Sequence, residues 1–291
     1  MTARRGATIA VSAMCLGVSA LGWAGCAGPE VKAPSQAPEP VLWPPELPGR
    51  PAAPTERPGR PARVTTVQLG HSVLGRPIEA VIVAGERGCV VILGGIHGDE
   101  PSSSALVERL VTHLKAHPED CAGRTVVLIP RANPDGLAAG TRWNARGVDV
   151  NRNFSTRNFT VESRHGQVPL SEPESRALVA AIARYQPSCV ISVHGPLNCI
   201  DADGGARSRR LADEMARVSP LPVKDLPAHP GSLGSYAGTD LGLQMVTYEL
   251  DRKEAPAWGA AGYLGRHLRP LLLAIAKCEL GGASADAHIG K

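Results

Sequence analysis

The chain has 291 residues, 43% of them hydrophobic, which is enough for a packed core in one large domain or two small ones. Its formal charge of +4 becomes +2 when the two arginines of the N-terminal leader are set aside. This small excess excludes the broad basic surface that nucleic-acid binding requires, so we expect no nucleic-acid partner.

Residues 1–26 are typical of an export signal. Two arginines precede an apolar run over 7–21, which is shorter than the roughly 20 residues of a membrane-spanning helix. An Ala-Gly pair then stands before Cys26, as in the processing site of bacterial lipoproteins. We therefore expect an exported, periplasmic protein anchored to a membrane through a lipid on Cys26, with ordinary signal cleavage as the alternative.

Residues 27–61 contain 11 prolines and almost no periodic apolar pattern. Proline-rich chain is extended and semi-rigid, so this segment is predicted to be a tether between the membrane and a folded domain. A disordered remnant without a role is the alternative. The patterns of a folded domain occupy residues 62–280, and residues 281–291 are left as a C-terminal tail.

Within 62–280, predicted strands alternate with predicted helices. Alternating residues indicate a hairpin of 64–69 and 78–84, and apolar runs indicate further strands at 90–96, 125–129, 189–193 and 244–250. Helices are expected after Glu100 with Ser102 or Ser103 as N-cap, after a capping box at 171–174, and at 206–217 and 257–278. Asn133-Pro134-Asp135-Gly136 is a turn signal. This alternation predicts one α/β domain with a mixed parallel and antiparallel sheet flanked by helices.

Cysteines 89, 121, 189, 199 and 278 would enter a compartment in which disulfides persist. Cys89 and Cys121 precede two strands that could be neighbours, which suggests a bridge between them. Since five cysteines cannot all pair internally, the remaining connectivity stays open.

Polar residues end three of the predicted strands. His97 follows 90–96 and is itself followed by Glu100, His194 follows 189–193, and Glu249 lies near the end of 244–250. The carboxyl ends of strands in an open α/β sheet form the usual ligand-binding edge. Two histidines and a glutamate with an open fourth position are the ligands of a catalytic zinc site, and one further carboxylate could act as a base.

The motifs between these residues are specific in their order. H-x-x-E is followed by N-P-D-G, by G-T-R-W-N-A-R-G-V-D-V-N-R-N-F at 140–154, by S-E-P-E, by H-G-P-L and by P-G-S-L-G-S-Y-A-G. Over residues 63–275 the chain resembles the zinc carboxypeptidase family, and within it the murein peptide amidase branch. The resemblance implies a zinc-carboxypeptidase-like catalytic domain at 62–280.

The resemblance also implies a metal centre. One zinc ion per chain would be held by His97, Glu100 and His194, and Glu249 would be the general base. Asp149 would accept a hydrogen bond from His97 and so orient this ligand.

Substrate contacts are implied by the same resemblance. Arg142 would polarise the scissile carbonyl, while Asn151 and Arg152 would hold the free carboxylate of the substrate, for which the guanidinium fork is suited. Ser232 and Tyr236 belong to a loop expected to shape the pocket of the leaving residue, with Tyr236 as a candidate for the mobile tyrosine of digestive carboxypeptidases.

The function implied is metal-assisted hydrolysis of the γ-D-glutamyl–meso-diaminopimelate bond in peptidoglycan-derived peptides, by a monomer or weak oligomer. Three alternatives remain open at this point: a zinc carboxypeptidase acting on ordinary peptide C-termini, a zinc deacylase of N-acyl amino acids, and a non-catalytic wall-binding lipoprotein.

Overall fold

The structure is a computed structural model, and it describes residues 63–251 and 261–279, which belong to the folded domain. The predicted export signal, the lipidation at Cys26, the proline-rich tether and the C-terminal tail lie outside the described residues.

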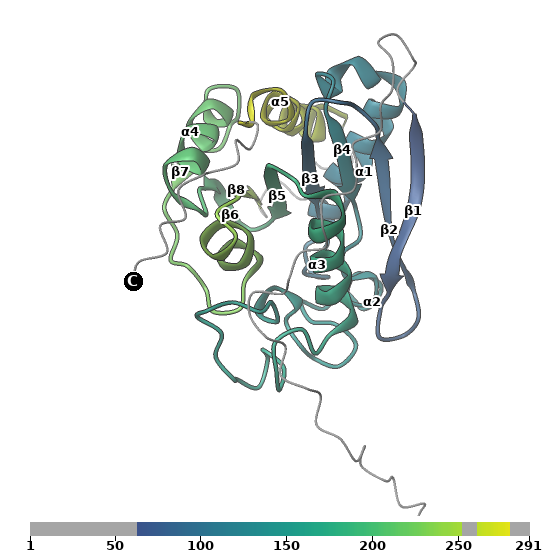
Figure 1. Ribbon diagram of the computed structural model, residues 1–291, viewed down its shortest axis with the longest axis vertical. Coiled ribbons are helices and arrows are strands. Elements are labelled where there is room, and N and C mark those ends of the chain that lie inside the picture. Colours follow the sequence, from purple (N-terminus) through teal and green to yellow (C-terminus); the bar gives the residue numbers. More distant parts are fainter. Residues whose placement is uncertain (1–62, 252–260, 280–291) are drawn as a thin grey trace, which may run out of the picture. The chain divides into compact units, whose positions relative to one another are not determined.

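A single sheet forms the centre of the domain (Figure 1). Its eight strands, in chain order, are β1 (Val64–His71), β2 (Pro77–Val83), β3 (Cys89–Leu93), β4 (Thr125–Ile129), β5 (Cys189–His194), β6 (Leu197–Asp201), β7 (Val223–Lys224) and β8 (Gln244–Asp251). In space the order is β1-β2-β4-β3-β5-β8-β6-β7. The four central strands β4, β3, β5 and β8 are parallel. The pairs β1–β2, β2–β4 and β6–β8 are antiparallel, and β7 pairs parallel with β6. The predicted mixed sheet is confirmed.

Helices cover both faces of this sheet (Figure 1). They are α1 (Pro101–Ala116), α2 (Pro134–Ala139), α3 (Pro173–Tyr185), α4 (Gly205–Ala216) and α5 (Ala261–Lys277), with shorter turns η1 (Pro118–Cys121), η2 (Val150–Arg152) and η3 (Gly234–Asp240). Helices α1, α4 and α5 share a core with the central strands, while α3 packs near β1. None of the described helices has the length and apolar character needed to cross a membrane.

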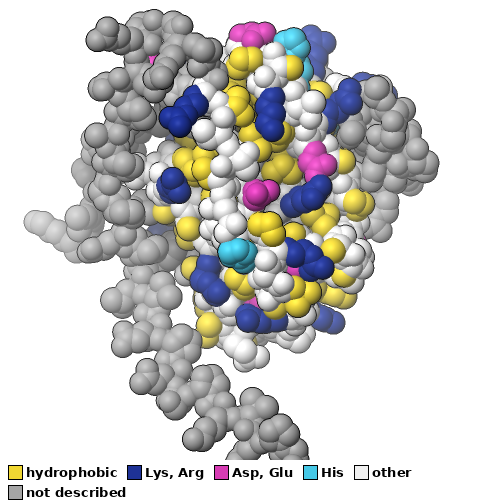
Figure 2. Space-filling view, turned by 90° about the vertical axis from the view of Figure 1, so that its right-hand side faces the viewer, with side chains coloured by type: hydrophobic (Ala, Val, Ile, Leu, Met, Phe, Trp, Pro, Cys, Tyr) yellow, Lys and Arg dark blue, Asp and Glu magenta, His cyan; other side chains and the backbone are white. Residues whose placement is uncertain are grey.

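The central strands β3 and β4 are buried on both faces, which is why their sequences are runs of apolar residues. Val90 and Ile92 of β3 belong to the core beneath α1, α4 and α5, and Val91 and Leu93, which alternate with them, are also buried. Parallel strands covered by helices on both sides show this pattern. The edge strand β1 is half-exposed, and its sequence alternates accordingly. On the described part of the face in Figure 2, basic and acidic side chains are interspersed rather than gathered by sign.

The predicted helix caps were wrong. Glu100 is the N-cap of α1, and Ser103 Oγ instead donates to the carbonyl oxygen of Glu100 at 2.7 Å. The capping box before α3 does not form, because Glu174 accepts hydrogen bonds from the Asn144 side chain and from the amide of Val73. Tertiary contacts therefore take up the side chains that local capping would have used.

Two further local expectations also changed. The turn predicted at 133–136 is the start of α2, where Asn133 Oδ1 accepts from the amide of Gly136 at 2.9 Å. The Cys89–Cys121 bridge was wrong, because all five described cysteines are free and buried. In the parallel β3–β4 pair the partner of Cys89 is Thr125, and Cys121 lies before this strand at the end of η1.

Candidate active site

The carboxyl ends of β3, β5 and β8 meet at one edge of the sheet. His194 at the end of β5 pairs in register with Glu249 of β8, and His97 follows the end of β3 by four residues. A cavity of ≈ 160 Å³ opens at this edge and is lined by these three residues and by Glu100. The parallel arrangement thus brings together residues that are far apart in the sequence.

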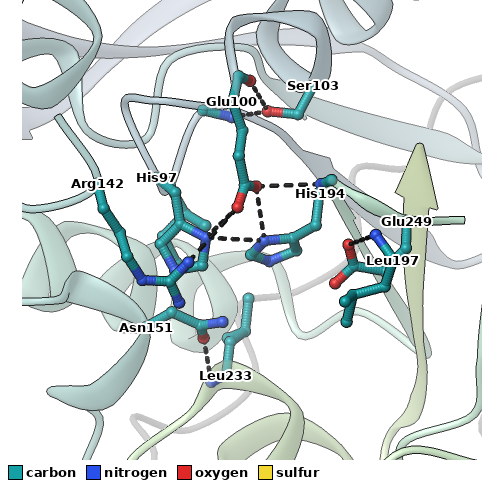
Figure 3. Close-up of polar contacts among 12 residues, drawn as sticks. His97, Glu100, Ser103, Arg142, Asn151, His194, Leu197, Leu233 and Glu249 are labelled. Atoms are coloured by element: carbon teal, nitrogen blue, oxygen red, sulfur yellow. Dashed lines mark hydrogen bonds and ion pairs between the residues drawn. The ribbon is translucent and has the colours of Figure 1, made fainter. Parts of the chain in front are cut away.

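His97, Glu100 and His194 converge on one point (Figure 3). Glu100 Oε1 lies 2.8 Å from His97 Nδ1, and Glu100 Oε2 lies 3.1 Å from His194 Nδ1. The two Nδ1 atoms are 3.2 Å apart, and all three side chains are buried. Two imidazole nitrogens and a carboxylate oxygen facing one another in this way fit a catalytic zinc site with an open position.

The loop after β3 allows this convergence because it packs directly against α2. A Cβ atom added at Gly98 would stand 1.9 Å from the carbonyl carbon of Gly136, so only glycine fits there. The loop then enters α1 at Glu100, where the positive end of the helix dipole favours a carboxylate. The amide of Gly195 also donates to Glu100 Oε2 at 3.2 Å.

The charges at this point favour a cation. Burial raises the pKa of Glu100, but hydrogen bonds from His194 and His97 outweigh it and hold the pKa well below its usual range. Burial lowers the pKa of His97, but its hydrogen bonds to Asp149 and Glu100 outweigh this and raise the pKa to about 9. The surroundings therefore stabilise positive charge between these side chains, as a metal site requires.

Asp149 connects the metal-binding residues to Arg142. Its Oδ1 lies 3.2 Å from His97 Nε2, and its Oδ2 accepts from Arg142 Nε at 2.9 Å. The amide of Asn151 donates to Oδ1 at 2.9 Å. Burial raises the pKa of Asp149, but the His97 hydrogen bond and the charges of His97, Arg142 and Arg152 together lower it well below its usual range. Asp149 is therefore placed to fix both the His97 ring and the Arg142 guanidinium.

Glu249 lies at the cavity beside His194 without joining the ligand cluster (Figure 3). One carboxylate oxygen accepts from the amide of Leu197 at 3.3 Å. Burial raises the pKa of Glu249, and the charge of Glu100 adds to this effect. A carboxylate with a raised pKa is suited to accept and release a proton.

Asn151 and Arg152 line the same cavity. Asn151 Oδ1 accepts from the amide of Leu233 at 2.8 Å, which orients the side-chain amide. Arg152 Nη1 donates to the carbonyl oxygen of Asn151 at 2.7 Å, and burial lowers the pKa of its guanidinium. The arrangement places hydrogen-bond donors where a substrate carboxylate could bind.

Of the two residues predicted for the leaving-residue pocket, Ser232 lines the cavity and Tyr236 does not. Ser232 lines the cavity, but its hydroxyl is engaged by Ser235, whose amide donates to Ser232 Oγ at 3.0 Å. Tyr236 is 2% exposed, stacks on Phe154 with ring centroids 5.7 Å apart, and is not among the residues that line the cavity. In this structure Tyr236 therefore packs in the interior rather than facing the cavity.

Several cavity residues gave no signal in the sequence. Asp201, Asp203 and Thr247 line the cavity together with Leu197 and Leu226. Except for Leu197, which ends the H-G-P-L motif, they belong to no motif that we singled out, and they come from β6, the segment after it, the segment after β7, and β8. Alternation along β8 offered one clue, because Thr247 and Glu249 are two positions apart and so face the same side of the strand.

Comparison with known proteins shows which enzymes the domain is similar to. The model of the zinc carboxypeptidase family matches residues 58–200. Murein peptide amidase A of Escherichia coli K12 is 37% identical over 207 residues, which is 63% of this chain and 80% of the relative. The enzyme of the same name from Vibrio campbellii is 33% identical over 208 residues, covering 64% and 79%.

A solved structure also matches. The crystal structure of the murein-tripeptide amidase from Escherichia coli O157 superimposes with a TM-score of 0.57 at 32% sequence identity, covering 77% of this chain and 96% of that one. The similarity therefore extends through the folded domain and is not confined to isolated motifs.

Proposed function

Because the chain belongs to the zinc carboxypeptidase family, we propose that it is a zinc amidase that cleaves the γ-D-glutamyl–meso-diaminopimelate bond of murein peptides. The family makes it a zinc-dependent hydrolase. The observation that carries the proposed substrate is the similarity to the murein peptide amidases, which spans about four fifths of their length.

One zinc ion would be held by His97, Glu100 and His194, whose ligand atoms lie within 4.8 Å of one another. When bound, zinc acts as a Lewis acid and lowers the pKa of a coordinated water to about 7. The hydrogen bond to Asp149 keeps the His97 ring oriented with Nδ1 towards Glu100.

Glu249 would supply the proton transfers. Its carboxylate takes a proton as water attacks the amide carbon and then passes this proton to the nitrogen of the leaving amine. Its raised pKa suits both steps, because burial favours the neutral, protonated carboxyl group over the carboxylate, and this protonated form carries the proton from the first step to the second. Arg142 would stabilise the negative charge that develops on the carbonyl oxygen.

Arg152 and Asn151 would select the end of a chain. A guanidinium pairs with a carboxylate through two parallel hydrogen bonds, and the oriented amide of Asn151 adds a further donor. The leaving residue would then carry a free carboxylate, as diaminopimelate does at the end of a murein tripeptide.

The cellular location of the protein is proposed from its sequence alone. A lipid on Cys26 and the proline-rich segment after it would hold the catalytic domain near the periplasmic face of a membrane. The expected result is a lipid-modified N-terminus at Cys26 by mass spectrometry of the mature protein, and its loss from the membrane fraction in Cys26→Ala.

The test of the activity is mass spectrometry of products after the zinc-loaded protein is incubated with L-Ala-γ-D-Glu-diaminopimelate. Release of free diaminopimelate, absent in Glu249→Gln, is the expected result. Turnover only of an ordinary L-peptide would indicate a carboxypeptidase, and turnover only of N-acyl amino acids would indicate a deacylase. No turnover with zinc bound would indicate a non-catalytic wall-binding protein.

A further inference from the structure

Asp203 is a carboxylate in the active-site cavity that the proposed reaction does not use. It is half-buried and lines the cavity together with Thr247 and Glu249. Thr247 Oγ1 donates to Asp203 Oδ2 at 2.6 Å. Within residues 63–251 and 261–279, no Lys, Arg or His forms an ion pair with Asp203 within 4.0 Å. The carboxylate therefore lies at the substrate cavity without a cationic partner among these residues.

The position of Asp203 relative to Glu249 is set by β8. Thr247 and Glu249 are two residues apart on one strand and share its cavity face, while Tyr248 between them lies in the opposite core. Residues two apart in a strand are separated by roughly 6–7 Å. Because Asp203 is hydrogen-bonded to Thr247, its carboxylate is displaced from the proposed base, Glu249, by about this distance along the strand. The side chain of a leaving residue can span such a distance.

Burial raises the pKa of Asp203 to about 6, while the Thr247 hydrogen bond acts in the opposite direction and the charge of Asp201 adds to the increase. The group is mostly ionised at neutral pH. A buried carboxylate without a cationic partner is destabilised relative to water, so a cationic group of a ligand would offset this cost.

Asp201, the other cavity aspartate, has a role in the fold that explains it. Its Oδ1 accepts from the amide of Leu226 at 3.0 Å, which fixes the segment after β7 against the end of β6. Asp201 therefore serves as a matched control, because asparagine could keep its hydrogen bond and remove only its charge.

Two glycines in η3 let the backbone of this turn pass close to Asp203. A Cβ atom at Gly234 would stand 2.4 Å from Asp203 Oδ1, and one at Gly238 would stand 2.3 Å from the Asp203 carbonyl oxygen. Both contacts are shorter than a real Cβ atom could make. Replacing Gly234 by alanine must therefore displace the Asp203 carboxylate, which offers a second way to test its role.

We propose that Asp203 determines specificity by receiving the ammonium group at the far end of the leaving residue's side chain. The enzyme then prefers leaving residues that carry a distal amine, of which diaminopimelate is one. This inference rests on the proposed function, since it assumes that the cavity holds a leaving residue bound through its free carboxylate.

The test compares leaving residues with and without this amine. The substrates are L-Ala-γ-D-Glu-X with X as meso-diaminopimelate, L-lysine or L-norleucine, because lysine and norleucine share a four-carbon side chain and only lysine ends in an amine. Asp203→Asn is expected to lower kcat/KM by roughly 10- to 100-fold for diaminopimelate and lysine, as for loss of a hydrogen bond to a charged group. Norleucine should be cleaved by Asp203→Asn as well as by the unmodified protein.

Three controls decide the interpretation. The ratio of kcat/KM for the lysine substrate to kcat/KM for the norleucine substrate should be unchanged in Asp201→Asn. An equal fall of this ratio in both aspartate variants would overturn a direct contact between the amine and Asp203. Gly234→Ala should reduce the ratio, whereas Gly265→Ala, where an added methyl meets nothing within 4 Å, should not. An unchanged ratio in Asp203→Asn refutes the inference even if all γ-linked substrates are cleaved.

Failure of the proposed function gives a different result, because the unmodified protein would then cleave none of the γ-linked substrates. The same ratio is in that case measured on N-acyl-L-lysine and N-acyl-L-norleucine or on the corresponding α-linked peptides. Loss of the lysine preference in Asp203→Asn would support the inference, and no change would overturn it.

Discussion

Asp149→Asn is expected to weaken both the metal site and the position of Arg142. Asp149 accepts three hydrogen bonds in the site, from His97 Nε2 at 3.2 Å, Arg142 Nε at 2.9 Å and the Asn151 amide at 2.9 Å. Asparagine has one acceptor oxygen and one amide group, so at least one donor would face another donor. The substitution also removes the negative charge that favours a cation at His97.

The size of the effect can be worked out from these contacts. Loss of a carboxylate partner of a histidine ligand typically costs about 10- to 100-fold in metal affinity, which corresponds to roughly 1.4–2.8 kcal/mol. Losing the charged hydrogen bond to Arg142 removes a further 1.5–3 kcal/mol, approximately, where this guanidinium is needed in the transition state. We therefore expect weaker zinc binding and, at saturating zinc, a lower kcat/KM.

The assay is zinc competition against a chromophoric chelator, followed by kinetics at saturating zinc. Asp135→Asn is the matched control, because Asp135 is equally buried and accepts hydrogen bonds from Arg76, Ser72 and the Leu74 amide outside the cavity. Both variants should lose stability, but only Asp149→Asn should lose zinc affinity. Equal zinc affinity in Asp149→Asn and the unmodified protein would refute the reasoning.

Three other predictions concern Glu249, Gly98 and the cysteines. Burial raises the pKa of Glu249, and its carboxylate acts as a base only when it is ionised. The value of kcat/KM should therefore fall as the pH drops, with a midpoint above 4.5. A midpoint of this pH profile at or below 4.5 would contradict the role of Glu249 as base. Gly98→Ala should lower the melting temperature and the zinc affinity together, because its Cβ would overlap Gly136, and calorimetry with and without zinc checks this. Native protein should react slowly with a thiol reagent at its described cysteines, and unfolded protein should show them all as free thiols; fewer free thiols would indicate a disulfide.

Much of the fold could be predicted because the sequence of each central strand carries its own signal. A strand covered by helices on both faces is mostly apolar, so β3 and β4 appear as apolar runs and β5 is interrupted only by Ser192 before His194. The order of strands in the sheet was not available from these runs, since pairing depends on contacts between residues far apart in the chain.

Helix starts and cysteine pairing were less predictable for a related reason. Glu174 fits a capping box in the sequence, yet its carboxylate binds Asn144 and Val73 from other segments. Cys89 begins β3 and Cys121 precedes the neighbouring strand β4, yet the two cysteines are not bonded, and the residue opposite Cys89 is Thr125. Local patterns cannot show which partners tertiary packing will supply.

The sequence by itself determined the chemical groups of the site: two histidines and a glutamate at or just after strand ends, Glu100 three residues after the first histidine, and an Asp-x-Asn-Arg run between them. The two histidines and Glu249 could be identified because their polarity is unexplained where an apolar strand ends, whereas the Asp-x-Asn-Arg run was identified by its resemblance to the zinc carboxypeptidases. Only the tertiary structure brought Asp203 to Thr247, a contact between residues 44 positions apart, and placed Tyr236 against Phe154. Such contacts depend on strand order and on how closely glycine-containing segments can approach, and these properties arise only when the whole domain is folded.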